Sequence, residues 1–493
     1  MKKTIKTLIN SFYFFPFLLP VFFVVHGFQE NYDFVQVNDA FNLIGIYIAA
    51  TAVMIFLLYL FFKNLSKASL ITFLLMSFHF FFGSVYDIVK KKIPHSFFST
   101  YSFIIPATLI LLIITIFLLK RKPAPPKILF LYLNSLFLIL LLIDGISIAY
   151  KYHLKETEKR YVLKRFEPYT SGSKPDIYCI ILDEYAGQKE LNELLKFNNS
   201  LFYTDLEKRD YHLIRESKSN YFSTPLSVAS FFNMDYLDFS KGSQEQEKVL
   251  FSYNKIRHSP FLQFLLAEGY NFYNFSIFDF YDHKSIATPT FLPTAKTLIT
   301  SQTFLSRIQI DLGYHLYTTL HFKQNLEDHI YTDLRNNENA YAMTSKIASE
   351  KAQKPKFVYT HLMMPHYPYY FNKDGVPRSL DELTVKNKFN PEFYTEYLSY
   401  CNKKILTLSD EIQKKSPGAI IILAGDHGFR AFNEEVDTQY FFNNFCALYL
   451  PSNKYAGFYN GLSPVNMFRV LLNTEFNQKL NLLKDSTVLF NKE

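Results

Sequence analysis

The sequence is poor in cysteine. It contains only three, at positions 179, 401 and 446. They lie far apart and form no C-x-x-C pair, whereas a disulfide framework or a zinc ribbon needs cysteines at short, repeated spacings. The sequence therefore indicates neither of these scaffolds.

The sequence also has no concentrated block of positive charge. The formal net charge is +8, but the lysines are scattered along the chain. A nucleic-acid-binding surface needs basic side chains gathered on one face. The densest group, at 120–122, lies beside an apolar run, which is typical of the flank of a membrane segment. We therefore expect a lipid membrane as a partner and no nucleic acid.

Long apolar runs are present instead, and hydrophobic residues make up 49% of the chain. Each run has roughly the 20 residues that cross a bilayer. The runs cover about 7–29, 40–62, 68–86, 98–119 and 128–148. The first follows a basic start, "MKKTIK", but it is long and no A-x-A-like cleavage site follows, so we interpret it as an anchor and not as a signal peptide. The sequence thus predicts a transmembrane domain of about five helices over residues 1–150.

The lysines and arginines between these runs predict the orientation. If the spans alternate, one side carries Lys2, Lys3, Lys6, Lys63, Lys67, Lys120, Arg121, Lys122 and Lys127, and the other carries Lys90, Lys91 and Lys92. The positive-inside rule then places the N-terminus in the cytoplasm. After five spans the chain beyond residue 150 faces outward, as a periplasmic or extracellular domain on the cytoplasmic membrane. An even number of spans would reverse this orientation.

The remainder of the chain has an α/β pattern. Residues 151–173 are charged and then rich in Pro, Gly and Ser, which predicts a juxtamembrane helix and a linker. The domain predicted over 174–493 contains five short apolar runs, "DIYCIILD", "YNFYNFSI", "KFVYTHLM", "AIIILAGD" and "FCALYLP". Longer helical patterns such as 391–415 separate them. Runs that are apolar on both faces favour a parallel-rich central sheet covered by helices on both sides.

Polar side chains end three of these runs. Asp183 follows the first, His361 and His366 lie at the third, and Asp426 and His427 end the fourth. Ligands collect at the carboxyl ends of parallel strands. An Asp after a strand is often only a turn former, but three such ends in one domain favour a site. Carboxylates with an imidazole suit Mn²⁺ or Zn²⁺, with Mg²⁺ and Ca²⁺ as alternatives, and do not suit copper or iron-sulfur chemistry, which prefers thiolates.

A candidate nucleophile lies in "SKSNYFSTPLSVASFFNMDYL". Pro225 fits the first position of a helix, which makes Thr224 the predicted N-cap. A hydroxyl there lies where backbone N–H groups favour an incoming phosphate or sulfate, and metal coordination would activate it. Thr224 could instead simply cap the helix, and Ser223 and Ser227 are alternative nucleophiles.

From about residue 174 onward, the chain resembles the alkaline phosphatase and sulfatase superfamily. It looks most like the membrane-anchored branch that includes lipoteichoic acid synthases and phosphoethanolamine transferases, which have about five N-terminal spans and an external catalytic domain. The stretches that carry the resemblance are "KPDIYCIILDEYAG", "SNYFSTPLSVASFFNMDYL", "VYTHLMMPHYPYYFNKDG", "LAGDHGFR" and "LSPVNMFRVLLN". The resemblance implies an alkaline-phosphatase-like fold for the domain.

The resemblance also implies roles for individual residues. Asp183, Asp426 and His427 match metal ligands, and Thr224 matches a nucleophile that also touches the metal. Glu184 corresponds to a second acidic ligand of some sulfatases, or it supports the ligands from behind.

Three further residues match the substrate side of the family's site. His366 corresponds to the histidine that meets the substrate oxygen or the leaving group, with His361 as its alternate. Arg430 would neutralise a bound anion, unless it is an exposed structural arginine.

One departure from the family pattern separates two activities. Sulfatases carry C-x-P-x-R or S-x-P-x-R, whose first residue becomes formylglycine, whereas residues 223–227 read Ser-Thr-Pro-Leu-Ser and lack the Arg. A phosphorylated Thr224 fits better. The predicted function is metal-dependent transfer or hydrolysis of phosphodiester or phospholipid head groups, of the phosphoethanolamine or phosphoglycerol type, with a phospholipid or envelope glycan substrate. The alternatives are a sulfuric ester hydrolase that uses Ser223 and a non-catalytic membrane protein for binding or assembly.

Overall fold

The chain forms two compact units. The computed structural model describes residues 14–94, 96–121, 126–163, 165–169, 172, 174–239, 245–288, 295–319, 327–328 and 330–489. The first unit consists of Met1–Glu158 together with Pro293–Lys323, and the second of Lys159–Leu292 together with Gln324–Glu493. Segment 293–323 thus belongs to the first unit, although in the sequence it lies within the predicted catalytic domain.

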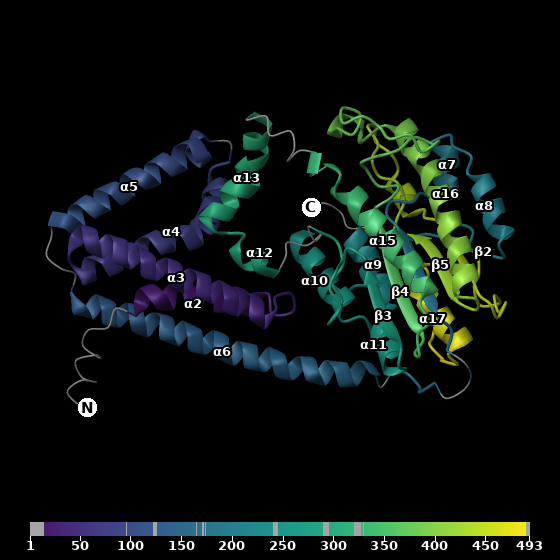
Figure 1. The fold of residues 1–493 in the computed structure, drawn as a ribbon, viewed down its shortest axis with the longest axis horizontal. Coiled ribbons are helices and arrows are strands. Elements are labelled where there is room, and N and C mark those ends of the chain that lie inside the picture. The colour runs from purple at the N-terminus through teal and green to yellow at the C-terminus, as the bar shows by residue number, and fades with distance from the viewer. Residues whose placement is uncertain are drawn as a thin grey trace. The chain divides into compact units, whose positions relative to one another are not determined.

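The first unit is helical (Figure 1). Its elements are α2 (Phe15–Glu30), α3 (Val37–Phe62), α4 (Leu65–Lys92), η1 (Phe97–Ser99), α5 (Tyr101–Arg121), α6 (Lys127–Leu163), α12 (Ala295–Thr300) and α13 (Phe304–Thr319). Among the described residues, four helices are long and apolar enough to cross a membrane, namely α3, α4, α5 and the first part of α6, and α2 is a shorter apolar helix. These correspond to the predicted spans, and the start of the first predicted span lies outside the described residues.

Helix α6 continues well beyond its apolar part. It runs without interruption from Lys127 to Leu163, so the predicted last span and the predicted juxtamembrane helix are one element. No Gly or Pro occurs between Tyr150 and Leu163, and these are the residues that most readily end a helix. The charged segment therefore extends the apolar one.

The second unit is built on a six-stranded sheet with the order β2-β6-β5-β1-β4-β3. The strands are β1 (Ile177–Leu182), β2 (His212–Leu213), β3 (Asn271–Phe275), β4 (Lys356–Leu362), β5 (Ile420–Gly425) and β6 (Cys446–Tyr449). Strands β3, β4, β1 and β5 are parallel neighbours, and β6 and β2 add antiparallel pairs at one edge. The five predicted strands all form, and the parallel-rich sheet is confirmed. The two-residue β2 was not predicted because it is too short for a sequence pattern.

Helices cover both faces of this sheet. They are α7 (Gln188–Glu193), α8 (Ser200–Glu207), α9 (Thr224–Asn233), α10 (Glu245–Arg257), α11 (Pro260–Ala267), α15 (Thr332–Ser349), α16 (Pro391–Lys415) and α17 (Pro464–Glu475), with short turns η2 (Val385–Asn387) and η3 (Thr438–Phe442). Side chains alternate along a strand. Tyr178 and Ile180 of β1 therefore join Leu398 of α16 in one core, whereas Tyr359 of β4 packs on Phe232 of α9, with ring centroids 4.7 Å apart.

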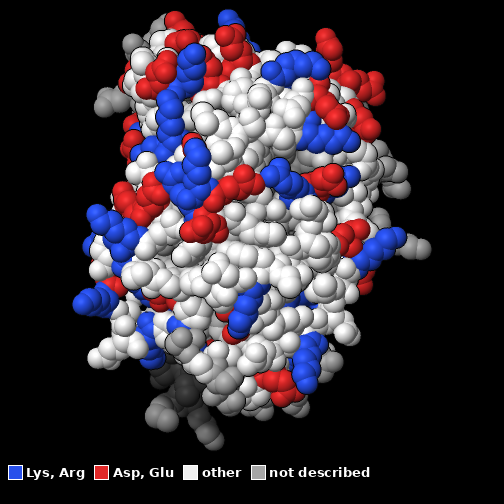
Figure 2. Space-filling model, turned by 90° about the vertical axis from the view of Figure 1, so that its right-hand side faces the viewer, with Lys and Arg blue, Asp and Glu red and all other residues white. Residues whose placement is uncertain are grey.

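The outer surface of the second unit mixes charges of both signs. In the view of Figure 2, basic and acidic side chains lie interspersed, with broad uncharged areas between them. Several are paired, for example Arg209 with Asp410 and Arg215 with Glu207. Such exposed pairs contribute little to stability.

Candidate metal centre

The register of three parallel strands places the predicted ligands together. Leu182 of β1 lies beside Gly425 of β5, so the next residues, Asp183 and Asp426, leave the same edge of the sheet side by side. On the other side of β1, Ile181 pairs with His361 of β4. This arrangement follows from the order and the register of the three strands.

Asp183, Asp426 and His427 form a compact buried cluster. Each offers one ligand atom, and these atoms lie within 4.8 Å of one another. The hydroxyl of Thr224, at the start of α9, completes the group. Its Oγ1 lies 3.1 Å from His427 Nε2 and 3.4 Å from Asp183 Oδ2. The structure thus brings together the four residues that the sequence analysis selected as ligands.

The chemistry of this cluster fits a divalent cation. Among the described residues, the buried oxygens Asp183 Oδ1 and Asp426 Oδ2 have no hydrogen-bond partner, and leaving a buried polar atom unpaired is costly. His427 Nδ1 lies 2.8 Å from the carbonyl oxygen of Gly428. Because a carbonyl oxygen only accepts, Nδ1 carries the proton, and Nε2 points its lone pair toward the Thr224 hydroxyl, 3.1 Å away. Two unpaired carboxylate oxygens and this lone pair are suitable ligands for a metal.

Burial and proximity separate the pKa values of the two carboxyl groups. Burial, together with the charge of Asp183, raises the pKa of Asp426 well above its ordinary value. Burial acts to raise the pKa of Asp183 as well, but the hydrogen bond from His361 and the neighbouring histidines outweigh it, and the pKa is lowered. Burial also lowers the pKa of His427 well below its ordinary value, which keeps the imidazole neutral. A bound cation would favour the ionised form of both carboxyl groups.

His361 lies behind Asp183. Its side chain is fully buried, and its Nε2 lies 3.2 Å from Asp183 Oδ2. Its Nδ1 lies 3.0 Å from the hydroxyl of Tyr359. If Tyr359 donates to Nδ1, the proton of the neutral ring is on Nε2 and is donated to the carboxylate. That His361 contacts the substrate stays a prediction. The contacts seen here make His361 a positioning residue for Asp183.

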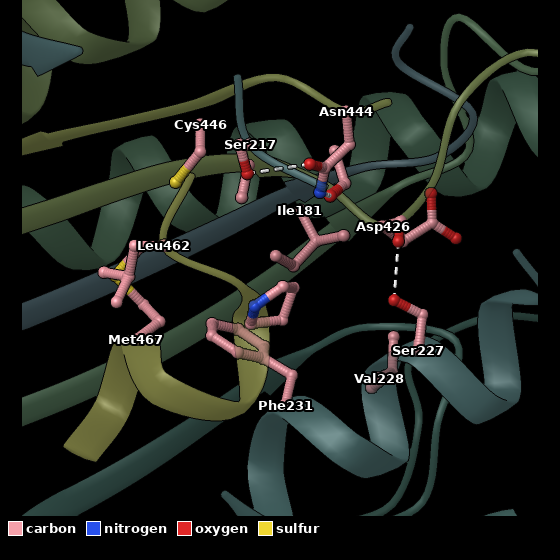
Figure 3. A pocket seen from close by; sticks show the side chains of 13 residues that line it. Ile181, Ser217, Ser227, Val228, Phe231, Asp426, Asn444, Cys446, Leu462 and Met467 are labelled. Atoms are coloured by element: carbon pink, nitrogen blue, oxygen red, sulfur yellow. Dashed lines mark hydrogen bonds between the residues drawn. The ribbon is translucent and has the colours of Figure 1, made fainter. Parts of the chain in front are cut away.

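Two buried side chains hold the backbone on either side of Asp426. Asn444 Nδ2 donates to the carbonyl oxygen of Gly425 at 2.6 Å, and Ser227 Oγ donates to that of Asp426 at 2.5 Å. Figure 3 shows both residues at the wall of a small cavity whose other lining is largely apolar. Because its hydroxyl is engaged with a carbonyl, Ser227 is poorly placed to be the nucleophile.

The start of α9 differs by one residue from the prediction. Ser223 is the N-cap, with extended backbone angles, and its carbonyl oxygen accepts the first helical bond from Ser227 N at 2.8 Å. Thr224 is therefore the first residue of the helix and not the N-cap. Among the described residues, the Ser223 hydroxyl makes no hydrogen bond to the cluster, whereas that of Thr224 does.

Glu184 connects the cluster to two more exposed residues. Its N–H donates to Asp426 Oδ1 at 2.9 Å. Its carboxylate lies 3.9 Å from His366 Nε2 and accepts the backbone N–H of Arg430 at 3.1 Å. The side chains of His366 and Arg430 are 27% and 32% exposed, in contrast to the buried ligands. His366 and Arg430 thus lie around Glu184, at the open side of the site.

Sequence reasoning missed Tyr359. It lies in the middle of β4 and not at a strand end, where a sequence pattern predicts ligands. One signal was present, because residues two apart on a strand share a face, and Tyr359 precedes His361 by two positions.

No protein-family model matches the sequence, and no curated protein does. Solved structures with a similar arrangement include the C-terminal periplasmic domain of EcEptC from Escherichia coli in complex with zinc, at 11% identity and a TM-score of 0.39 over 63% of this chain and 85% of that one. The integral membrane lipooligosaccharide phosphoethanolamine transferase A (EptA) from Neisseria meningitidis is similar at 10% identity and a TM-score of 0.35 over 95% of both chains. An alkaline phosphatase superfamily protein from Vibrio parahaemolyticus is similar at 13% identity and a TM-score of 0.36, over 62% of this chain and 68% of that one.

Proposed function

We propose that this chain is a metal-dependent transferase or hydrolase of phosphodiester head groups that acts through a covalent intermediate on Thr224. The observation that carries the proposal is the position of the Thr224 hydroxyl. It lies at the N-terminus of α9, 3.1 Å from His427 Nε2, beside two carboxylates that have unpaired buried oxygens.

The N-terminus of α9 suits an anionic substrate. The first backbone N–H groups of a helix have no partner within the helix, and the helix dipole favours negative charge there. A phosphate held at this end would have its phosphorus next to Thr224 Oγ1. A divalent cation held by Asp183, Asp426, His427 and Thr224, Mn²⁺ or Zn²⁺ in the first place, would lower the pKa of the hydroxyl and neutralise phosphate charge.

His366 is the candidate acid for the leaving group. Its Nδ1 lies 2.6 Å from the carbonyl oxygen of Tyr367, so Nδ1 donates and the ring orientation is fixed, with Nε2 toward Glu184. The Thr224 hydroxyl would lose its proton to solvent when the cation binds. As Thr224 Oγ1 then forms its bond to phosphorus and the bond to the departing alcohol breaks, Nε2 would give its proton to that alcohol. The neutral ring would then accept a proton from the acceptor hydroxyl or water that releases the phosphate group from Thr224.

Arg430 supports the approach of an anion. Its Nη1 donates to the carbonyl oxygen of Phe222 at 2.8 Å, two residues before Thr224, and its side chain is about one-third exposed. A guanidinium in this position adds positive charge near the start of α9. We therefore assign it to substrate binding and not to proton transfer.

The membrane helices favour a lipid substrate. The chain contains four helices long and apolar enough to cross a bilayer among its described residues. With the shorter apolar helix α2 counted as the fifth span, the predicted orientation puts the site in the predicted catalytic domain on the outer side of the cytoplasmic membrane. Transfer of a phosphoethanolamine or phosphoglycerol group from a phospholipid to a lipid or envelope glycan fits this location, and hydrolysis is the same chemistry with water as the acceptor.

The test uses the full-length protein in phospholipid vesicles with Mn²⁺ or Zn²⁺. Mass spectrometry of the peptide that contains residues 223 and 224 should show a phosphorus-containing adduct on Thr224. The adduct should be absent in Thr224→Ala and present in Thr224→Ser, which keeps a hydroxyl. Formylglycine at Ser223 would show instead that the sulfatase alternative is right, and absence of both the adduct and a bound metal would favour a binding protein.

A further inference from the structure

A segment from between two strands of the second unit is part of the first unit. Residues 295–319, which we call the return segment, contain α12 and α13 and lie in the sequence between β3 and β4. They belong with the membrane helices, and Figure 1 shows them in green beside the purple and blue helices α3 and α4. The chain thus crosses between the units at three places, near residues 158, 292 and 323.

The side chain of Ile299 anchors α12 in the helical unit. It is 4% exposed and belongs to an apolar core with Val24 and Phe80. Gly27 of α2 permits this approach, because a Cβ at that position would lie 2.9 Å from Ile299 Cγ2. Glycine here serves close packing between helices, as small residues do in membrane proteins.

A second glycine allows direct contact between backbones. The N–H of Gly83, within α4, donates to the carbonyl oxygen of Gln302 at 2.8 Å. A Cβ at Gly83 would lie 2.7 Å from that oxygen and 2.9 Å from Gln302 Cα. Both are backbone atoms, so no rotation of a side chain would relieve the overlap.

Beyond Gln302, α13 makes aromatic contacts with α4. The ring of Phe304 lies 5.1 Å from that of Phe78 and 5.0 Å from that of Phe82, centroid to centroid. These distances are typical of attractive aromatic pairs. These contacts lie near the middle of α4, beside Gly83.

A charged network follows on the next turn. Arg307 pairs with Asp87 of α4 and lies 3.9 Å from Asp311, which accepts a hydrogen bond from the hydroxyl of Tyr101. Charges are costly within a bilayer, and the predicted orientation places this part of α4 at the outer boundary. Apolar, aromatic and ionic contacts therefore all fix the return segment to the membrane helices.

We infer that the return segment is a second anchor, which docks on α2, α3 and α4 and holds the second unit to the membrane independently of α6. The docking surface is defined by Gly27, Phe78, Phe82, Gly83 and Asp87, and its partner is residues 295–319 of the same chain. A single connection through α6 would leave the second unit free to detach when that connection is cut. The return segment removes this dependence.

The experiment cuts the connection through α6 in the full chain. A protease site is inserted after Leu163, where α6 ends, and membranes that contain the protein are cleaved and washed. The fragment that begins after the cut should stay in the membrane pellet. It should move to the supernatant when docking is disrupted by Gly83→Leu on the membrane side or by Arg307→Asp on the segment side, which leaves α4 unchanged.

Two variants serve as controls. Gln309→Ala changes an exposed residue of α13 and should leave the fragment in the pellet. The fragment that carries Thr224→Ala should also stay in the membrane pellet. This result would separate anchoring from the proposed activity. Metal content of the released fragments reports whether they stay folded. Release of the unaltered fragment, or retention of both docking variants, would overturn the inference.

Discussion

The buried and open halves of the site are built differently. The buried half contains Asp183, Asp426 and His427, which are almost inaccessible to solvent and are held by backbone groups and by buried side chains from several elements. The open half contains His366 and Arg430, with about 30% of each side chain exposed. Both lie beside Glu184, and each also donates to one backbone carbonyl oxygen. The first arrangement fixes atoms in place, and the second leaves room for a substrate.

This difference suggests a division of tasks. A metal site needs ligands that keep their geometry before the ion arrives, and burial in a packed sheet provides this. Groups that exchange protons with substrate and acceptor need access to both. Changes in the buried half should therefore affect metal binding first, and changes in the open half should affect turnover with the metal still bound.

The largest effect is expected from Asp426→Asn. The amide keeps an oxygen for the N–H groups of Glu184 and His427, which Asp426 Oδ1 now accepts, so the fold should persist. The substitution removes one of the two carboxylates of the cluster. We therefore expect metal content to fall to background and activity to be lost. Metal analysis of the purified protein, together with a turnover assay, measures both.

Glu207→Gln is the matched control for that change, because this carboxylate is exposed and pairs with Arg215 on the surface. Metal content and activity should stay as in the unaltered chain. Full metal binding in Asp426→Asn would show that the cluster is not the metal centre.

A smaller effect, confined to turnover, is expected from His366→Gln. General acid catalysis typically contributes about 10²- to 10⁴-fold, so activity on a natural diester should fall within that range while metal content stays unchanged. The loss should shrink with a nitrophenyl leaving group, which needs no proton to depart. An equal loss with both leaving groups would contradict the assignment of His366 as the acid.

The predicted ligands of the candidate site, which the structure brings together, share one property. Asp183 and Asp426 end strands, and in a parallel sheet the register alone brings strand ends to one edge, without knowledge of any side-chain packing. Thr224 was found through the chemistry of a helix start, although the N-cap was assigned one residue too late. Each rule depends only on the residues at the end of a strand or at the start of a helix, so a single sequence is enough to apply it.

The parts that were missed depend on contacts between distant segments. Tyr359 matters only because its hydroxyl meets His361 within a packed core. The return segment carries charges such as Arg307 and Asp311 among its apolar residues, so it does not have the pattern of a membrane span. Its place in the first unit depends on Gly27 and Gly83, which lie more than 200 residues earlier in the chain. Such complementarity is a property of two surfaces and not of either sequence pattern.

The smallest of these effects should come from Tyr359→Phe, which tests whether the buried half extends beyond the ligands. The ring would still pack on Phe232, so the change removes only the hydroxyl that fixes His361. Loss of the direct partner of a metal ligand typically weakens metal affinity by about 10- to 100-fold. Tyr359 contacts that partner and not the ligand, so we expect a loss at or below the lower end of this range, and metal titration of the apo-protein measures it. Tyr178 is also buried, but it lies near the start of β1, at the end of the strand away from Asp183. Tyr178→Phe should therefore leave the metal affinity unchanged. If both variants bind metal equally well, His361 needs no support from Tyr359, and the fixed geometry of Asp183 must come from the strand register and the backbone alone.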